Sequence, residues 1–309
     1  MEGIQRGSNG GNSTSYIALE QQQQHPAETS KSIEQPQHDC IYVPGGGFSG
    51  FWFSLGRLQS LSAKDMFQEK FVCYSAGCLG VVATLLQHMQ AEMSIADMGT
   101  HGSGSSRSTT ASSSPPNNNN DHSSHLYNMA RNIQVEWLNG DLHRYRIVES
   151  FVDGILESLE AMRDNDDPAV QAYYQRFFDI VSSNLYITTT SVPTEKGDDK
   201  ALGGGASLKA TLRQPSSIQD LKQMLLQTTW IPMATGSSFA HEGHLDGAFS
   251  ALQHPSCARD VGLVVPRQNG QSWYSLLANT AQLFGNALNV NLGKQAVEDL
   301  WQMGLEYGV

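Results

Sequence analysis

A serine between a short apolar run and a helical pattern is the first residue of this sequence that could do chemistry. It lies in the run Cys73-Tyr74-Ser75-Ala76-Gly77. This run matches the nucleophile-elbow pattern G-x-S-x-G except at Cys73, which replaces the first glycine. The tight turn needs small residues two positions before and after the serine, and Gly77 meets that requirement. Such a turn exposes the Ser75 hydroxyl above a helix N-terminus, which stabilises negative charge. A serine that only caps the helix is the alternative.

A glycine-rich segment follows the first apolar run of the chain. It reads GGGFSG over residues 45–50. Consecutive glycines let backbone N–H groups point into a pocket without obstruction by side chains. Such donors can bind an oxyanion or a phosphate. The phosphate interpretation is weak, because the segment lacks the P-loop lysine and fits the dinucleotide-binding spacing badly. A plain flexible turn is the other interpretation.

An aspartate late in the chain is the third candidate. Asp246 follows the apolar Leu245 and precedes Gly247 in the run HLDGA. An Asp-Gly pair after an apolar residue is a common turn signal, so the pattern alone favours a turn.

The elements that must position these residues alternate between short apolar runs and helical patterns. The predicted strands cover 40–43, 71–74, 185–192, Leu245 and 262–265. The predicted helices cover 51–61, 76–90, 142–163, 169–184 and 217–228. Strand, glycine turn and helix in repetition predict an α/β fold with a mainly parallel sheet, in which chemistry lies at the carboxyl ends of the strands.

Polar, low-complexity segments divide the chain. We expect residues 1–37 to be a disordered tail and residues 38–309 to be one domain, interrupted by a disordered insertion at about 99–125. Neither segment has enough apolar surface to offset its ordering entropy. The stretch 193–216 is expected to be irregular.

The charge balance limits the partners. The formal net charge is −11, from 19 Lys and Arg against 30 Asp and Glu. This argues against nucleic acid, and against a membrane bound through a basic patch. Lipid contact would therefore be hydrophobic. Six residues near the motifs could make such contact or pack in the core: Phe48, Phe51, Trp52, Phe53, Trp230 and Ile231.

The chain contains four cysteines, at positions 40, 73, 78 and 257. They form no CxxC pair, so a zinc or redox motif is disfavoured, and a reducing compartment is expected. Cys73 and Cys78 are expected to be small buried packing residues. Residues 1–25 contain no apolar run typical of a signal peptide, which predicts a cytoplasmic protein.

Taken together, the three motifs resemble the patatin-like phospholipase family. The order of glycine-rich segment, elbow serine and late Asp-Gly is the same. The aromatic residues after Gly50 are similar to the animal lipid-droplet lipase branch of that family. Two further segments resemble family elements, the strand NLYITTT at 184–190 and the helix at 216–229 with its Trp-Ile-Pro ending. The resemblance covers about Asp39 to Arg267.

The resemblance implies a three-layer fold and a Ser–Asp dyad. Ser75 would attack an ester carbonyl of a triacylglycerol or phospholipid, and Asp246 would accept its proton without a histidine, metal or cofactor. Backbone N–H groups would hold the oxyanion, from Gly45, Gly46, Gly47 and Ala76. Small residues would support the motifs, at Gly50, Cys73, Gly77 and Gly247. Because an exposed aspartate is a weak base, Asp246 must be desolvated. The protein would be cytoplasmic, and peripheral on lipid droplets or membranes.

Two departures from the family pattern leave alternatives open. Cys73 stands where the elbow usually has glycine, and Ala248 stands where DGG is the commoner form. A crowded elbow would tilt Ser75, so a catalytically silent, lipid-bound adaptor is one alternative.

An esterase with a Ser75–Asp246–His254 triad is the other alternative, since the order of these residues fits. We expect His254 to be a surface loop residue, because it lies only eight residues after Asp246 and precedes Pro255. His241 and His244 have metal-like spacing but no supporting carboxylate.

Overall fold

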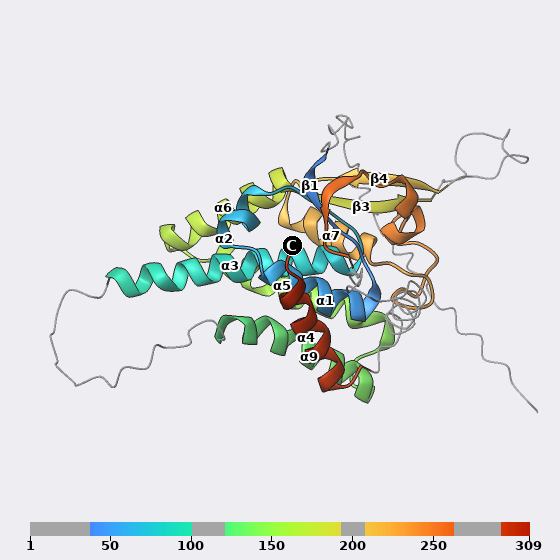
Figure 1. Cartoon of the computed structure of the whole chain (residues 1–309), viewed down its shortest axis with the longest axis horizontal. Coiled ribbons are helices and arrows are strands. Elements are labelled where there is room, and N and C mark those ends of the chain that lie inside the picture. The colour runs from blue at the N-terminus through green and yellow to red at the C-terminus, as the bar shows by residue number, and fades with distance from the viewer. Residues whose placement is uncertain (1–37, 101–120, 193–207, 263–291) are drawn as a thin grey trace, which may run out of the picture. The chain divides into compact units, whose positions relative to one another are not determined.

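A mixed β-sheet forms the centre of the fold (Figure 1). The computed structural model describes residues 38–100, 121–192, 208–262 and 292–309, all of which belong to one compact unit, Glu34–Val309. The strands are β1 (His38–Val43), β2 (Phe71–Cys73), β3 (Leu185–Ser191), β4 (Lys209–Arg213), β5 (His244–Leu245) and β6 (Cys257–Asp260).

The sheet has the strand order β4-β3-β2-β1-β6, with β5 also paired to β3. The pairs β1–β2, β1–β6 and β2–β3 are parallel, whereas β4 and β5 run antiparallel to β3. The predicted α/β class with a mainly parallel sheet is therefore confirmed. The arrangement is compatible with a three-layer fold.

Strands β2 and β5 both pair with the same edge of β3, which brings distant parts of the chain together. Thr190 pairs with Ala210 of β4 and with Leu245 of β5, so β5 lies on the edge opposite β4. Strand β2 pairs with the same edge nearer the start of β3, where Cys73 pairs with Ile187. Since β2 runs parallel and β5 antiparallel to β3, their carboxyl ends face each other. The residues that follow these two strands are thus directed toward the same place.

The helices are α1 (Gly47–Gln59), α2 (Ala63–Gln68), α3 (Ala76–Thr100), α4 (Asp121–Asn139), α5 (Ile147–Arg163), α6 (Pro168–Asn184), α7 (Ile218–Thr228) and α9 (Lys294–Tyr307), with 3-10 turns η1 (Arg144–Arg146) and η2 (Gly247–Gln253). Side-chain caps define several starts. Ser217 accepts a hydrogen bond from the Asp220 N–H at the start of α7, and Asp167 accepts one from Ala169 at the start of α6. Such caps satisfy N–H groups that the helix leaves without an acceptor.

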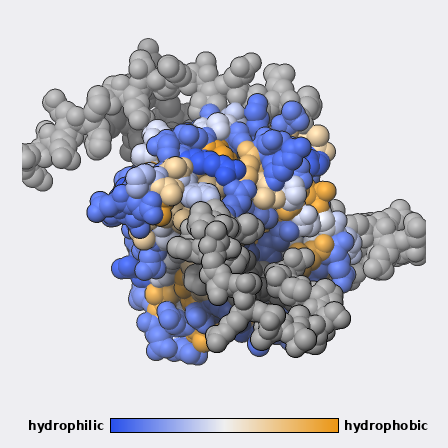
Figure 2. All heavy atoms as spheres, turned by 90° about the vertical axis from the view of Figure 1, so that its left-hand side faces the viewer, coloured by the Kyte–Doolittle hydropathy of each residue, from blue (hydrophilic) through white to orange (hydrophobic). Residues whose placement is uncertain are grey.

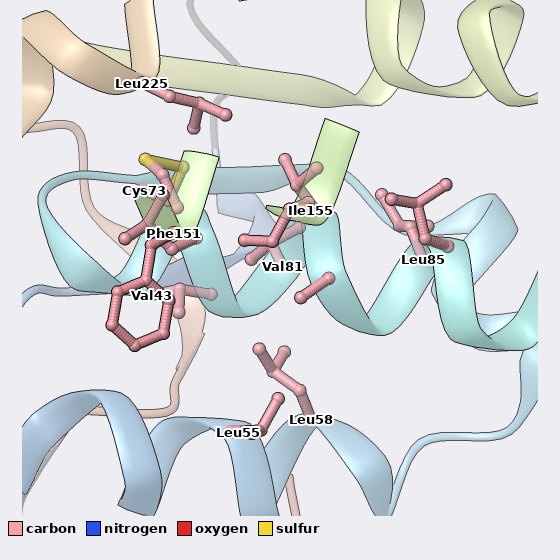
Figure 3. Close-up of a cluster of buried hydrophobic side chains, with 14 of the residues drawn as sticks. Val43, Leu55, Leu58, Cys73, Val81, Leu85, Phe151, Ile155 and Leu225 are labelled. Carbon is pink, nitrogen blue, oxygen red and sulfur yellow. A yellow bond between two sulfur atoms is a disulfide. The ribbon is translucent and has the colours of Figure 1, made fainter. Parts of the chain in front are cut away.

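The core lies where α1, α3 and α5 meet (Figure 3). Leu55 and Leu58 of α1 face α3, and Phe151 and Ile155 of α5 lie beside the start of α3. All four are at most 5% exposed. Each fully buried side chain of this size contributes about 1.5–3 kcal/mol of transfer free energy. The core therefore holds the start of α3, which follows Ser75, rigidly against its neighbours.

Helix α9 packs on α1 at unusually short range. A Cβ on Gly56 would lie 2.1 Å from the Trp301 carbonyl oxygen, and one on Gly304 would lie 2.2 Å from the Phe53 carbonyl oxygen. The Arg57 guanidinium also donates to the Gly308 carbonyl at 2.6 Å. The last described segment of the chain thus fixes α1, whose first turn carries the glycine-rich segment.

Several predicted boundaries are wrong. The insertion predicted at about 99–125 overlaps helix at both ends, since α3 reaches Thr100 and α4 begins at Asp121. The helix predicted from Leu142 begins at Ile147, after η1. The stretch expected to be irregular contains β4, which is defined by its pairing to β3 rather than by its own pattern. The tail 1–37 and the segments 101–120 and 193–207 lie outside the described residues, and so does most of the predicted strand 262–265. The strand that the structure shows beside β1 is β6, which was not predicted.

The cysteines are paired, which corrects the expectation of free thiols. Cys40 of β1 bonds Cys257 of β6, and Cys73 at the end of β2 bonds Cys78 in the first turn of α3. Cys73 and Cys78 are both 0% exposed, so their predicted burial is confirmed. Spacing alone cannot reveal a pair 217 residues apart, such as Cys40 and Cys257.

The surface seen in Figure 2 is mostly hydrophilic where the described atoms are visible, with hydrophobic residues in small separate groups. Within the described ranges, no helix combines the length and the hydropathy needed to cross a bilayer.

Candidate active site

Ser75 lies in a strained turn between β2 and α3. Its φ angle is 53°, in the left-handed region that non-glycine residues rarely adopt. Its N–H donates to the Thr228 hydroxyl at 2.9 Å, and that hydroxyl donates to the Thr188 carbonyl at 2.6 Å. Backbone strain of this kind persists where surrounding contacts fix it, and it clusters at functional sites. Thr228 is the residue that supplies this contact.

Gly77 allows the turn to pass close to β1. A Cβ at this position would lie 2.3 Å from the Val43 carbonyl oxygen and 2.5 Å from that of Pro44. No side chain fits there, which confirms the steric reason for a small residue two positions after Ser75. Cys73 at the other end of the elbow is accommodated in the core, and Ser75 keeps the elbow conformation.

Gly45 lies directly against the serine. A Cβ on Gly45 would be 2.6 Å from Ser75 Cβ and 3.1 Å from Ser75 Oγ. Burial raises the pKa of the neighbouring Tyr74 phenol. Gly45 therefore lets the first loop approach Ser75.

Gly46 and Gly47 form the start of α1. Both have positive φ angles, 142° and 58°, and Gly46 accepts a hydrogen bond from the Gly50 N–H at 2.9 Å. A Cβ on Gly50 would be 3.0 Å from the Gly45 carbonyl oxygen, which explains the fourth glycine of the segment. Gly47 and Ala76 are the first residues of α1 and α3, and both line one pocket with Ser75. First-turn N–H groups have no acceptor within their own helix, so two helix N-termini offer donors beside Ser75.

Asp246 is completely buried after β5. Its N–H donates to the Trp230 carbonyl at 2.9 Å, and its carbonyl accepts from the Thr190 hydroxyl at 2.8 Å. Its side-chain Oδ1 accepts from the Ala248 N–H at 2.8 Å. Oδ2 has no hydrogen-bond partner of normal geometry among the described residues. One carboxylate oxygen is thus held in place while the other is left for a further donor.

The loop that carries Asp246 contacts the elbow. A Cβ on Gly247 would be 2.5 Å from the Thr188 carbonyl oxygen and 2.5 Å from Tyr74 Cβ, so this glycine is required by close packing. Burial raises the pKa of Asp246 to about 7, and the facing Ser75 hydroxyl is the largest influence in the opposite direction, ahead of the Ala248 N–H. Ser75 and Asp246 thus follow the facing ends of β2 and β5 on loops that contact each other, and burial raises the proton affinity of the Asp246 carboxylate toward that of a base near neutral pH.

Ser75 lines an apolar cavity of about 70 Å³ that is partly open to solvent. Apart from Ser75, the lining is glycine, aliphatic, aromatic and threonine side chains, from Gly47, Phe48, Phe51, Ala76, Leu79, Ile147, Val148, Phe151, Thr229, Ile231 and Thr235. The lining contains no charged residue. Such a cavity favours a hydrocarbon chain next to the hydroxyl.

Of the six residues expected either to contact lipid or to pack in the core, Trp52 and Phe53 are core residues at 0% and 1% exposure. Phe48, Phe51 and Ile231 line the cavity, with Phe51 4% exposed, and Trp230 is half-buried beside it.

His254 is not the surface loop residue expected. It is half-buried, and its two ring nitrogens contact the Tyr42 hydroxyl at 2.8 Å and the Gly247 carbonyl at 3.0 Å. Burial lowers its pKa. Since both nitrogens have partners other than Ser75 and Asp246, the triad arrangement is not formed.

His241 and His244 also have protein partners, Gln223 and Thr189. No cluster of three or more potential metal ligands occurs in the part of the chain that the structure describes.

Comparison with known proteins adds little to this geometry. No protein-family model and no curated protein matches the chain. A solved structure with some likeness is the heterodimeric ExoU–SpcU complex from the type III secretion system of Pseudomonas aeruginosa. The TM-score is 0.26 and the identity 12%, over 88% of this chain and 53% of that one. The chain thus spans about half the length of that solved chain, and a likeness at this score decides nothing about the site.

Proposed function

We propose that this chain is a serine hydrolase of the patatin-like type that cleaves carboxylic esters of acyl lipids. The proposal is supported by a strained serine beside an apolar cavity and by a fully buried aspartate on a contacting loop, whose pKa burial raises to about 7. A structural serine would need neither the strain nor the facing carboxylate.

The reaction follows from the geometry. Ser75 Oγ attacks the ester carbonyl carbon as Asp246 takes its proton, and the N–H groups of Gly47 and Ala76 stabilise the oxyanion. Asp246 then returns the proton to the departing alcohol, which leaves an acyl ester on Ser75. A water molecule, deprotonated by the same carboxylate, hydrolyses this ester and regenerates the serine.

The cavity selects the acyl part of the substrate rather than a head group. Its uncharged lining offers nothing to a phosphate, and the chain as a whole is acidic. Triacylglycerol fits this lining first, and phospholipid is the second candidate because its head group can remain outside the cavity.

Labelling with a fluorophosphonate probe tests the activation of Ser75 before any substrate is known. The wild type should label and Ser75→Ala should not. Asp246→Asn should label at least about 100-fold more slowly, the usual contribution of a general base. Ser54→Ala is the matched control, because Ser54 is a buried serine of α1 whose hydroxyl donates to the Phe51 carbonyl at 3.1 Å. Unchanged labelling of Asp246→Asn would exclude the dyad.

The silent, lipid-bound adaptor is distinguished by the same experiment. A folded wild type that does not label, yet floats with lipid vesicles, would support the adaptor and exclude the hydrolase. The cytoplasmic location stays a prediction, and the two disulfides argue against it because such bonds persist mainly in oxidising compartments.

A further inference from the structure

The loop between α7 and β5 forms part of the wall of the Ser75 cavity. We call residues 230–243 the rim loop. Ile231 and Thr235 line the cavity, whereas Met233 between them is 71% exposed. The rim loop therefore directs Ile231 and Thr235 to the cavity and the apolar Met233 side chain to solvent.

The rim loop is held in this conformation by its own hydrogen bonds. The Ile231 carbonyl accepts from the N–H groups of Ala234, Thr235 and Gly236. The Thr235 hydroxyl donates to the Thr229 carbonyl at 2.6 Å and accepts from the Ile231 N–H at 2.8 Å. Met233 itself has a φ of 62°, a left-handed conformation that costs free energy in a residue other than glycine. The outward position of Met233 is thus imposed by the loop.

A second apolar side chain is presented by the same loop. Phe239 is 67% exposed, and it follows Ser238, whose carbonyl accepts a hydrogen bond from the Trp230 indole at 3.1 Å. Trp230 packs so closely on Gly236 that a Cβ there would lie 2.1 Å from its ring. Met233 donates its N–H to the Gly236 carbonyl, so the segments that carry Met233 and Phe239 are both held by residues that contact Trp230.

The chemistry of the loop indicates its partner. Residues 230–240 read WIPMATGSSFA and contain no charged side chain, in a chain of net charge −11. Single exposed apolar side chains are common on protein surfaces, but Met233 and Phe239 project from the loop that also lines the apolar Ser75 cavity. The stretch 230–240 is uncharged, and the one acidic residue of the rim loop, Glu242, accepts a hydrogen bond from the Gln227 amide. An uncharged stretch with protruding Met and Phe side chains suits the hydrocarbon region below uncharged or zwitterionic head groups better than a charged protein surface.

We propose that the rim loop inserts Met233 and Phe239 into the surface of a neutral lipid layer, which places the mouth of the Ser75 cavity on its substrate. This inference rests on the proposed hydrolase function and adds to it the surface on which the enzyme works. The binding is hydrophobic, so salt should affect it little.

Flotation with phosphatidylcholine vesicles tests the proposal on the full chain. The double variant Met233→Ser, Phe239→Ser should bind about 100-fold more weakly than wild type, because two large apolar side chains lose their burial. Leu252→Ser is the matched control, since Leu252 is fully exposed on η2 and does not line the cavity. Ser75→Ala should float like wild type, so that failure of catalysis and failure of binding are read separately.

Hydrolysis provides the second measurement. The double variant should keep wild-type labelling by a soluble fluorophosphonate, and lose hydrolysis of long-chain ester in an emulsion by the factor found in flotation. The proposal is overturned if the double variant floats like wild type, if Leu252→Ser weakens flotation equally, or if high salt abolishes binding. Binding of the wild type to a protein but not to vesicles would also overturn it.

Discussion

Replacing Asp246 with asparagine should change the pH dependence of folding stability through a single buried carboxyl group. In the folded chain burial raises the pKa of Asp246 from the ordinary 3.8 to about 7. Between these values the folded state keeps a proton that the unfolded state releases. Wild-type stability therefore falls as pH rises from about 4 to about 7, and the loss is complete above that window.

The size of the effect follows from the same two pKa values. Their difference corresponds to about 4 kcal/mol, since each pKa unit is worth about 1.36 kcal/mol. Asparagine has the same shape and can still accept from the Ala248 N–H, but it carries no charge. The stability of Asp246→Asn relative to wild type should therefore increase by up to about 4 kcal/mol between about pH 4 and pH 8.

Urea unfolding of both proteins at several pH values in this range measures the difference directly. Asp141→Asn supplies the baseline, because it removes an exposed carboxylate from the same chain. A wild-type–variant difference that stays constant with pH would mean that burial does not raise the pKa of Asp246, and the argument for a neutral-pH base would be lost. Activity should show the opposite dependence, with kcat/KM rising toward a plateau above about pH 7 as the carboxylate forms.

Three further substitutions test how the site is positioned. Gly45→Ala should lower the labelling rate of Ser75 by about 100-fold or more in a fluorophosphonate assay, because the new methyl group would lie 2.6 Å from Ser75 Cβ; normal labelling would show that the loop can move aside. Thr228→Val removes the hydroxyl that links the Ser75 N–H to the Thr188 carbonyl. It should lower the free energy of unfolding in urea by about 1–3 kcal/mol and slow the labelling of Ser75, whereas an unchanged unfolding midpoint would contradict this linking role. His254→Gln should leave the labelling rate within about threefold of wild type, whereas a loss comparable to that of Asp246→Asn would restore the triad interpretation.

The elbow and the glycine segment could be predicted because their requirements are local. Gly77 must be small since a neighbouring carbonyl occupies the space of its Cβ, and a strand–turn–helix pattern surrounds Ser75 in the sequence itself. The desolvation of Asp246 was expected from the chemistry it would have to perform. The role of Gly45 was less visible, because only the structure shows that a Cβ at this position would meet the Ser75 side chain.

The remaining features depend on contacts between distant residues. Thr188, Thr190 and Thr228 read as ordinary strand and helix positions, and nothing in their local sequence reveals that they hold the Ser75 and Asp246 backbones. Strand β4 exists through its pairing to β3, and the Cys40–Cys257 bond joins the neighbouring strands β1 and β6, which are far apart along the chain. No local pattern carries this information.

The facing ends of β2 and β5 have a consequence for how this chain tolerates change. The separation between Ser75 and Asp246 is fixed by the positions of β2 and β5 along β3, not by the length of polypeptide between the two residues. Extra turns of helix between Cys73 and Leu185 would leave that separation intact. A shift of β5 by a single residue along β3 would turn Asp246 to the opposite face of the sheet and disable the site without loosening the fold.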